Sequence, residues 1–184
     1  EVIKAANQLA QKRIGALIVF ERGTSLAEFM EEGTTLDATV SKELLYTIFI
    51  PSFENPMHDG ALVIRDGRVW QAGAFLPLAG AVDRTLGARH RAALGITQET
   101  DAVVVVVSEE RGAVSLCFDG NIVRNLDGRS LRDALFGLFY RPVRPSRMPP
   151  PPTGRISLVG GDGTGTGSRG AAEPRDATPT VQTN

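Results

Sequence analysis

The stretch Ala102-Val-Val-Val-Val-Val107 decides the fold class, because it is the longest uninterrupted apolar run in the chain. A short run of β-branched residues is typical of a strand that is buried on both faces of a sheet. It is far shorter than the roughly 18 residues that cross a bilayer, so the sequence predicts no membrane span within this chain. A second run, Ile14-Gly-Ala-Leu-Ile-Val-Phe20, predicts another buried strand.

Segments with helical periodicity lie around these strands. Apolar spacing and capping signals predict helices over residues 2–13, 25–32, 41–50, 84–94 and 130–140. Asp66-Gly67 and Asp119-Gly120 each join two strand-like segments with a two-residue turn, which predicts hairpins over 61–75 and 113–124. Together these elements predict an α/β fold with a mixed central β-sheet flanked by helices on both faces.

The composition of the chain changes near Tyr140. Of the 11 prolines, eight lie between Pro142 and Pro179. Such a segment buries too little apolar surface to offset the entropy lost on ordering. The sequence therefore predicts a single folded domain over 1–140 and a disordered Pro/Gly/Arg-rich tail over 141–184.

Charge and cysteine content exclude several classes of protein. The 20 Lys and Arg residues are balanced by 21 Asp and Glu residues, and the net charge of −1 argues against bulk electrostatic binding of nucleic acid. The single cysteine, Cys117, excludes an internal disulfide and a cysteine-based zinc site, and is compatible with a reducing compartment. Because the chain begins with Glu1, we expect it to be a fragment or a processed product.

The first candidate for chemistry is His58-Asp59-Gly60-Ala61, which leads from a loop directly into an apolar strand. A glycine at a strand edge lets a ligand approach the backbone, and the neighbouring carboxylate can accept a proton or bind a metal. The alternative is an ordinary turn, because Asp-Gly pairs in loops are usually turns.

The second candidate is Arg89-His90-Arg91, on a predicted helix. Arginine binds phosphate oxygens with two parallel hydrogen bonds, and histidine can donate to phosphate or hold a carboxylate in place. The alternative is a packed histidine between two solvated arginines.

The third candidate is Ser108-Glu109-Glu110, at the end of the 102–107 strand. Ligands in open α/β sheets gather at the carboxyl ends of strands, where a hydroxyl and carboxylates can serve phosphate and metal. A hairpin loop of solvated acidic residues is the alternative.

With these residues placed, the chain resembles the catalytic domain of bacterial diadenylate cyclases, particularly the type that follows membrane helices. The pairing of Asp59-Gly60-Ala61 with Arg89-His90-Arg91 at this separation is the most specific part of the likeness. The resemblance covers nearly all of 1–140 and none of the tail, and runs through residues 14–21, 36–41, 58–61, 75–78, 86–96 and 107–110.

The resemblance implies that the protein is an enzyme, a nucleotidyltransferase that condenses two ATP molecules into cyclic di-AMP and two pyrophosphates. Each 3′-hydroxyl attacks the α-phosphate of the other nucleotide, so two active sites must face each other in a homodimer. The implied cofactor is a divalent metal ion, Mn²⁺ or Mg²⁺ or alternatively Co²⁺. The implied location is the cytoplasmic side of the cell membrane, with the tether in segments absent from this chain.

The same resemblance implies roles for individual residues. Asp59 positions or deprotonates the 3′-hydroxyl, and Gly60 and Ala61 supply close backbone contact. Arg89, His90 and Arg91 hold phosphates and stabilise charge at the α-phosphorus. The ATP site also takes in Phe75 and Leu76 beside adenine, Ser108 beside the triphosphate, and Gly87. The implied metal ligands are His58 and Glu110.

One residue departs from the family pattern, and two other functions stay open. Ala88 stands where family members commonly carry threonine, which removes one hydrogen bond worth about 0.5–1.5 kcal/mol. A non-catalytic sensor that binds ATP or cyclic di-AMP would use the same pocket. An interaction module would instead use the Pro/Arg-rich tail to dock on a partner. If the chain is an enzyme, a regulatory protein is a further expected partner.

Overall fold

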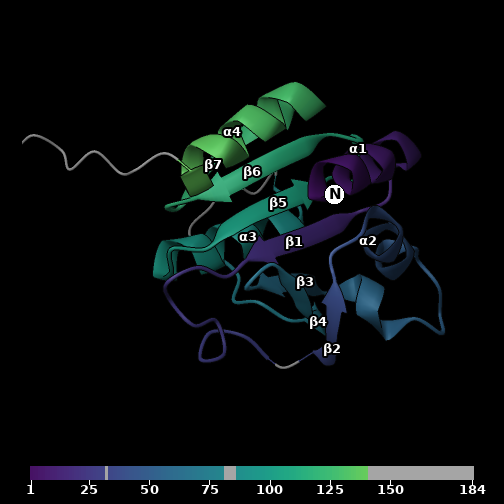
Figure 1. The fold of residues 1–184 in the computed structure, drawn as a ribbon, viewed down its shortest axis with the longest axis horizontal. Coiled ribbons are helices and arrows are strands. Elements are labelled where there is room, and N and C mark those ends of the chain that lie inside the picture. Colours follow the sequence, from purple (N-terminus) through teal and green to yellow (C-terminus); the bar gives the residue numbers. More distant parts are fainter. Residues whose placement is uncertain (32, 81–85, 141–184) are drawn as a thin grey trace, which may run out of the picture. The chain divides into compact units, whose positions relative to one another are not determined.

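The computed structural model describes residues 1–31, 33–80 and 86–140, and these residues build a seven-stranded sheet with the order β2-β4-β3-β1-β5-β6-β7 (Figure 1). β1 pairs in parallel with β3, and every other neighbouring pair is antiparallel. The predicted mixed sheet is therefore confirmed. The strands are β1 (Ala16–Phe20), β2 (Thr34–Thr39), β3 (Ala61–Arg65), β4 (Arg68–Ala74), β5 (Val103–Val107), β6 (Val114–Phe118) and β7 (Asn121–Leu126).

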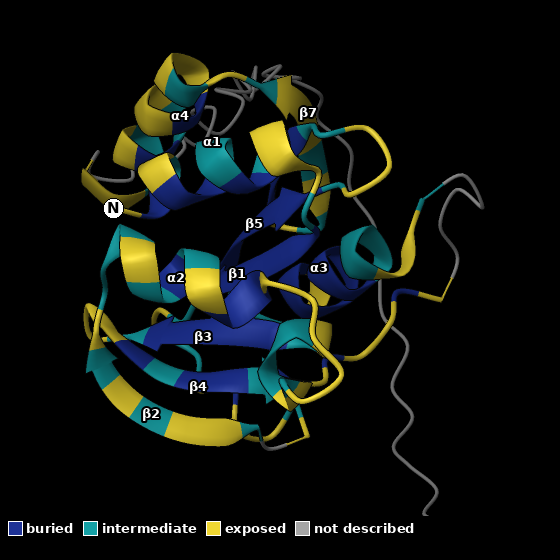
Figure 2. Ribbon diagram, turned by 90° about the vertical axis from the view of Figure 1, so that its right-hand side faces the viewer, coloured by how far each residue is buried: buried dark blue, intermediate teal, exposed yellow. Residues whose placement is uncertain are grey.

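Helices cover both faces of this sheet, as predicted. α1 (Val2–Lys12), α2 (Lys42–Phe49) and α4 (Gly128–Tyr140) pack on one face, and α3 (Ala88–Glu99) packs on the other (Figure 2). Every residue of β5 is buried, and alternate valines enter the two cores: Val105 packs with the α1, α2 and α4 side and Val104 with the α3 side. The valine run thus joins both cores, because successive side chains of a strand point to opposite faces.

Both predicted hairpins are confirmed by their turns. Asp66 and Gly67 have φ values of 51° and 74°, and Asp119 and Gly120 have values of 49° and 68°. Two successive residues with positive φ are characteristic of type I′ turns, whose twist matches that of the flanking strands.

The predicted helix over 25–32 is wrong for the residues that the structure describes. Leu26 is buried in a loop, and its main-chain N–H donates to Glu21 Oε2 at 3.1 Å. Asp101 accepts from the main-chain N–H groups of Gly23 and Thr24. These side-chain contacts, one of them to a residue far along the chain, fix the segment as a loop, so tertiary contacts override the local capping signal.

Other element boundaries also differ from the sequence prediction. The helix predicted over 84–94 begins at Ala88 and continues to Glu99. The edge strand β2 was not predicted, since its polar residues follow the exposed rim of the sheet. Residue 32, residues 81–85 and the tail at 141–184 lie outside the described part of the chain. Among the described helices, none is both long and apolar enough to cross a membrane.

The sheet topology brings most of the predicted site residues to one edge of the sheet, which is formed by the ends of neighbouring strands and not by the outer strands β2 and β7. Because β5 runs antiparallel to β1, its carboxyl end lies beside the amino end of β1, where Ala16 pairs with Val107. The amino end of β3 and the carboxyl end of β4 meet at the same edge, where Ala61 pairs with Ala74. This edge therefore receives the loops that precede β1 and β3 and those that follow β4 and β5.

Candidate active site

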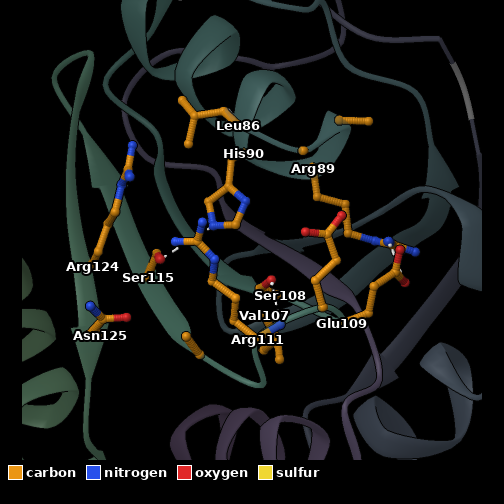
Figure 3. A pocket seen from close by; sticks show the side chains of 14 residues that line it. Leu86, Arg89, His90, Val107, Ser108, Glu109, Arg111, Ser115, Arg124 and Asn125 are labelled. Carbon is orange, nitrogen blue, oxygen red and sulfur yellow. Dashed lines mark hydrogen bonds and ion pairs between the residues drawn. The ribbon is translucent and has the colours of Figure 1, made fainter. Parts of the chain in front are cut away.

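Two adjoining pockets occupy this edge of the sheet. The apolar pocket, of about 350 Å³, is lined by apolar side chains from several elements and by Asp59 and Gly60; the apolar residues include Leu17, Ala61, Ala74, Phe75, Leu76, Leu78 and Ala92. The cationic pocket, of about 150 Å³, contains Arg89, His90, Ser108, Glu110, Arg111 and Arg124 (Figure 3). Ala88 and Arg89 line both pockets, so an elongated ligand can extend from one pocket into the other across the start of α3.

The position of Asp59 depends on a close contact between two glycines. Asp59 is the last residue of the short 3₁₀ helix η1 (Pro56–Asp59), and Gly60 follows it against Gly73 of β4. A Cβ added at Gly60 would lie 2.5 Å from the main-chain carbon of Gly73, so no larger residue fits. The pair brings η1 onto β4 and leaves the Asp59 side chain exposed beside the apolar pocket.

The apolar pocket is lined by both buried and exposed large hydrophobic side chains. Leu76 is buried beneath it, whereas Phe75 is 55% exposed at the end of β4. A half-exposed aromatic ring over a buried aliphatic floor suits a flat, partly polar ring system.

The amino end of α3 favours an anion. Its cap residue, Gly87, makes no side-chain hydrogen bond to the helix, and the first turn contains no acidic residue. The Gly87 carbonyl accepts from Arg91 N–H at 3.1 Å, so the main-chain N–H groups of Ala88, Arg89 and His90 come before the first helical hydrogen bond. Such N–H groups, together with the positive end of the helix dipole, attract phosphate oxygens.

Arg89 is held at the junction of the two pockets by Glu109. Arg89 Nη1 donates to Glu109 Oε2 at 3.0 Å. Both side chains lie directly over Gly15, where an added Cβ would be 2.6 Å from Arg89 Nη1 and 2.7 Å from Glu109 Oε2. Gly15 therefore gives the guanidinium room to lie flat at the start of β1.

His90 stands at the centre of the cationic pocket (Figure 3). Its Nε2 lies 3.4 Å from Ser115 Oγ. Burial lowers the pKa of His90 below its ordinary value of 6.5, and the charges of Arg124 and Arg111 lower the pKa further, against an opposite effect of Glu110. His90 is therefore mostly neutral at pH 7 and can donate one hydrogen bond without adding to the positive charge.

The structure brings most of the predicted site residues together. Asp59, Gly60, Ala61, Phe75 and Leu76 line the apolar pocket, and Gly87, Arg89, His90, Ser108 and Glu110 line the cationic pocket.

Two predicted site residues, Arg91 and His58, line neither pocket. The main-chain oxygen of Arg91 accepts from Ala79 N–H at 3.1 Å, and its buried Nε has no partner among the described residues. His58 instead contacts the main-chain oxygen of Asn55 through Nδ1. Their roles in binding phosphate and metal stay predictions.

Four polar residues of the cationic pocket were not predicted from the sequence, namely Arg111, Ser115, Arg124 and Asn125. The signal for two of them was present. Counting back from the two-residue turn of the predicted hairpin brings Ser115 and Arg124 close together, and the observed pairs Phe118 with Asn121 and Leu116 with Val123 follow that count up to the register shift between Val114 and Leu116. Arg111 directly follows Ser108-Glu109-Glu110 in the sequence, so it was an equally direct candidate.

Comparison with known proteins agrees with this geometry. The family model described as "DisA bacterial checkpoint controller nucleotide-binding" matches residues 3–122. The cyclic di-AMP synthase CdaA of Bacillus subtilis is 41% identical over 145 residues, which cover 78% of this chain and 52% of the relative. The chain thus spans about half the length of the curated relatives that it matches.

Solved structures give the same result. The structure of DacA from Staphylococcus aureus has a TM-score of 0.71 at 41% identity, covering 76% of this chain and 93% of that chain. A hypothetical membrane spanning protein from Bacillus cereus has a TM-score of 0.65 at 39% identity, covering 68% of this chain and 61% of that chain. These matches confirm the resemblance found in the sequence, and the chain belongs to the family of DisA-type bacterial nucleotide-binding domains, the DAC family.

Proposed function

We propose that this chain is the catalytic domain of a diadenylate cyclase, which condenses two ATP molecules into cyclic di-AMP and two pyrophosphates. The observation that carries the proposal is the junction of an apolar pocket and a cationic pocket at Arg89, with the Asp59 carboxylate at the side. The names of two similar proteins, a cyclic di-AMP synthase and a diadenylate cyclase, support the same reaction.

The two pockets suit the two parts of ATP. Adenine lies in the apolar pocket, between the exposed Phe75 ring and the buried Leu76. The triphosphate then passes the amino end of α3, where Gly87 and the first main-chain N–H groups of the helix lie, and enters the cationic pocket beside Ser108.

The reaction forms a bond between a 3′-oxygen and the α-phosphorus and breaks the bond to the pyrophosphate oxygen. Asp59 orients the 3′-hydroxyl and accepts its proton, while Gly60 and Ala61 let the ribose come close to the backbone. Arg89 and the neutral His90 donate hydrogen bonds to oxygens on the α-phosphorus as charge develops there. Arg91 enters the proposal by resemblance only, since its side chain lines neither pocket.

A facing copy of the same chain supplies the second nucleotide. Asp59 and Phe75 are exposed at the same edge of the sheet. An exposed base suits an acceptor hydroxyl that is presented from outside, as in a symmetric homodimer.

A divalent ion, Mn²⁺ or Mg²⁺, would offset phosphate charge during this reaction. The described residues contain no cluster of three or more His, Cys, Asp or Glu side chains. Magnesium is nevertheless commonly held by one or two carboxylates together with substrate phosphates. Glu110 lines the cationic pocket and fits that pattern, whereas His58, which lines neither pocket, enters the proposal as a second protein ligand by resemblance only.

The intact protein is tethered to the membrane through segments outside this chain, with this domain on the cytoplasmic side. The similar Bacillus cereus structure is that of a hypothetical membrane spanning protein, which supports the tether. A balanced net charge of −1 gives no support for nucleic acid as a partner.

The proposal is tested by measuring pyrophosphate release from ATP and Mn²⁺ over a range of protein concentrations. A cyclase that needs two facing copies shows a specific activity that rises with protein concentration, with one pyrophosphate released for each ATP consumed. ATP binding without release at every concentration would contradict the proposal and favour a nucleotide sensor.

A further inference from the structure

Arg124 lies at the end of the cationic pocket that is farthest from the apolar pocket. The two pockets share Ala88 and Arg89, whereas Ser115, Arg124 and Asn125 line only the cationic pocket (Figure 3). A nucleotide whose base occupies the apolar pocket therefore passes Arg89 first and reaches Arg124 last. The part of ATP that is farthest from adenine is the terminal pair of phosphates.

The charge around Arg124 is available for a ligand. Glu109 forms an ion pair with Arg89 at 3.0 Å, whereas neither Arg111 nor Arg124 forms one with a carboxylate among the described residues. Both arginines nevertheless lie close enough to His90 for their charges to lower its pKa. Two cations that share a pocket without a described carboxylate partner are suited to a polyanion.

The main chain at Arg124 is held in place by a β-hairpin, one strand of which packs in the core. It lies on β7, in a hairpin whose other strand, β6, is buried from Val114 to Cys117. Asn125, the next residue, has a positive φ of 58°, and the hairpin register shifts between Val114 and Leu116. A bulge at this point redirects the side chains of β7, as bulges beside functional sites commonly do.

We propose that Arg124 binds the terminal phosphates of ATP and, together with Arg111, holds the pyrophosphate as it leaves. This inference rests on the proposed cyclase activity. When the 3′-oxygen bonds to the α-phosphorus, the bond to the bridging oxygen breaks and its electron pair stays on pyrophosphate. Arg124 stabilises that added negative charge, whereas the 3′-hydroxyl proton goes to Asp59.

The test compares ligands with and without terminal phosphates. Binding of α,β-methylene-ATP and of cyclic di-AMP to the full chain is measured by titration calorimetry with Mn²⁺, for the parent and for Arg124→Met. We expect affinity for the ATP analogue to fall on the order of tenfold to a hundredfold, since charge-assisted hydrogen bonds are lost, while affinity for cyclic di-AMP stays within about twofold.

Two further variants serve as controls. Arg129→Met removes the same charge from an exposed residue of α4 outside both pockets, and we expect it to bind both ligands like the parent. Arg124→Lys keeps a cation but loses the planar fork, so we expect it to recover part of the lost affinity. Recovery in this variant shows that the loss in Arg124→Met does not come from misfolding.

Two results would overturn the inference. One is parental affinity of Arg124→Met for the ATP analogue, and the other is an equal loss of affinity for both ligands. Failure of the proposed function gives a different result. In that case the parent binds the ATP analogue but forms no cyclic di-AMP from ATP.

Discussion

Replacing Gly15 with alanine is expected to slow the cyclase without unfolding it. An alanine Cβ at this position would lie 2.6 Å from Arg89 Nη1, about 0.8 Å inside the 3.4 Å at which ordinary contact begins. It would also lie 2.7 Å from Glu109 Oε2, so the whole ion pair must move. Arg89 stands where the two pockets meet, and its displacement moves the guanidinium away from the phosphate that we propose it binds.

The expected losses of stability and of rate follow from the side chains that an alanine at Gly15 must displace. The atoms in the way are the ends of side chains that are 26% and 57% exposed, so their shift costs about 1 kcal/mol of stability or less. Misplacing a binding group by about 1 Å costs on the order of 100-fold in rate, or about 2.7 kcal/mol of barrier. We therefore expect kcat/KM to fall by 10- to 100-fold.

Initial rates of cyclic di-AMP formation and urea unfolding curves measure the two effects on the same preparations. Gly137→Ala is the matched control, because a Cβ there meets no atom within 4 Å and the residue lies on α4, away from both pockets. We expect it to keep the parental rate. A parental rate in Gly15→Ala would refute the placement of Arg89 at the reacting phosphate.

Three further predictions concern pH, helix capping and the tail. Because His90 has a lower pKa in the folded chain than its ordinary 6.5, the unfolded chain binds its proton first, so the free energy of unfolding falls as pH drops below about 6.5. His90→Gln should remove the contribution of His90 to the pH dependence of the free energy of unfolding, as measured by urea unfolding. An unchanged pH dependence would show that His90 is not its source. Ser41→Ala removes the acceptor for Leu44 N–H at 3.2 Å and should cost about 1 kcal/mol in the same measurement, with no change counting against the cap. Deletion of residues 141–184 should leave cyclase activity intact, and lost activity would show that the tail takes part.

Much of the fold could be predicted because local signals and tertiary contacts agree there. Val103–Val107 is buried throughout, and an apolar run has no other stable place in a small α/β domain. Each Asp-Gly turn adopts the conformation that its residue types favour. The loop after β1 was mispredicted because its backbone donors are satisfied by Glu21 and Asp101, and Asp101 is distant in sequence.

The candidate site was predictable where residues adjoin in sequence, and less so where the fold joins them. Asp59-Gly60-Ala61 and Arg89-His90-Arg91 were identified as short motifs, and all of their residues except Arg91 line a pocket. Arg124 comes from an edge strand, where an exposed arginine is ordinary, and only the hairpin register directs attention to it. The role of Gly15 depends on the packing of Arg89 over it, which no local pattern contains.

We propose that this chain makes cyclic di-AMP and that Asp59 is the group that activates the 3′-hydroxyl. The most direct test is mass spectrometry of the nucleotides formed when the full chain is incubated with ATP and Mn²⁺, beside an Asp59→Asn variant of equal stability. We expect cyclic di-AMP from the parent and none from the variant. Cyclic di-AMP at the same rate from both proteins would remove Asp59 from the mechanism, and none from a parent that binds ATP would contradict the cyclase itself.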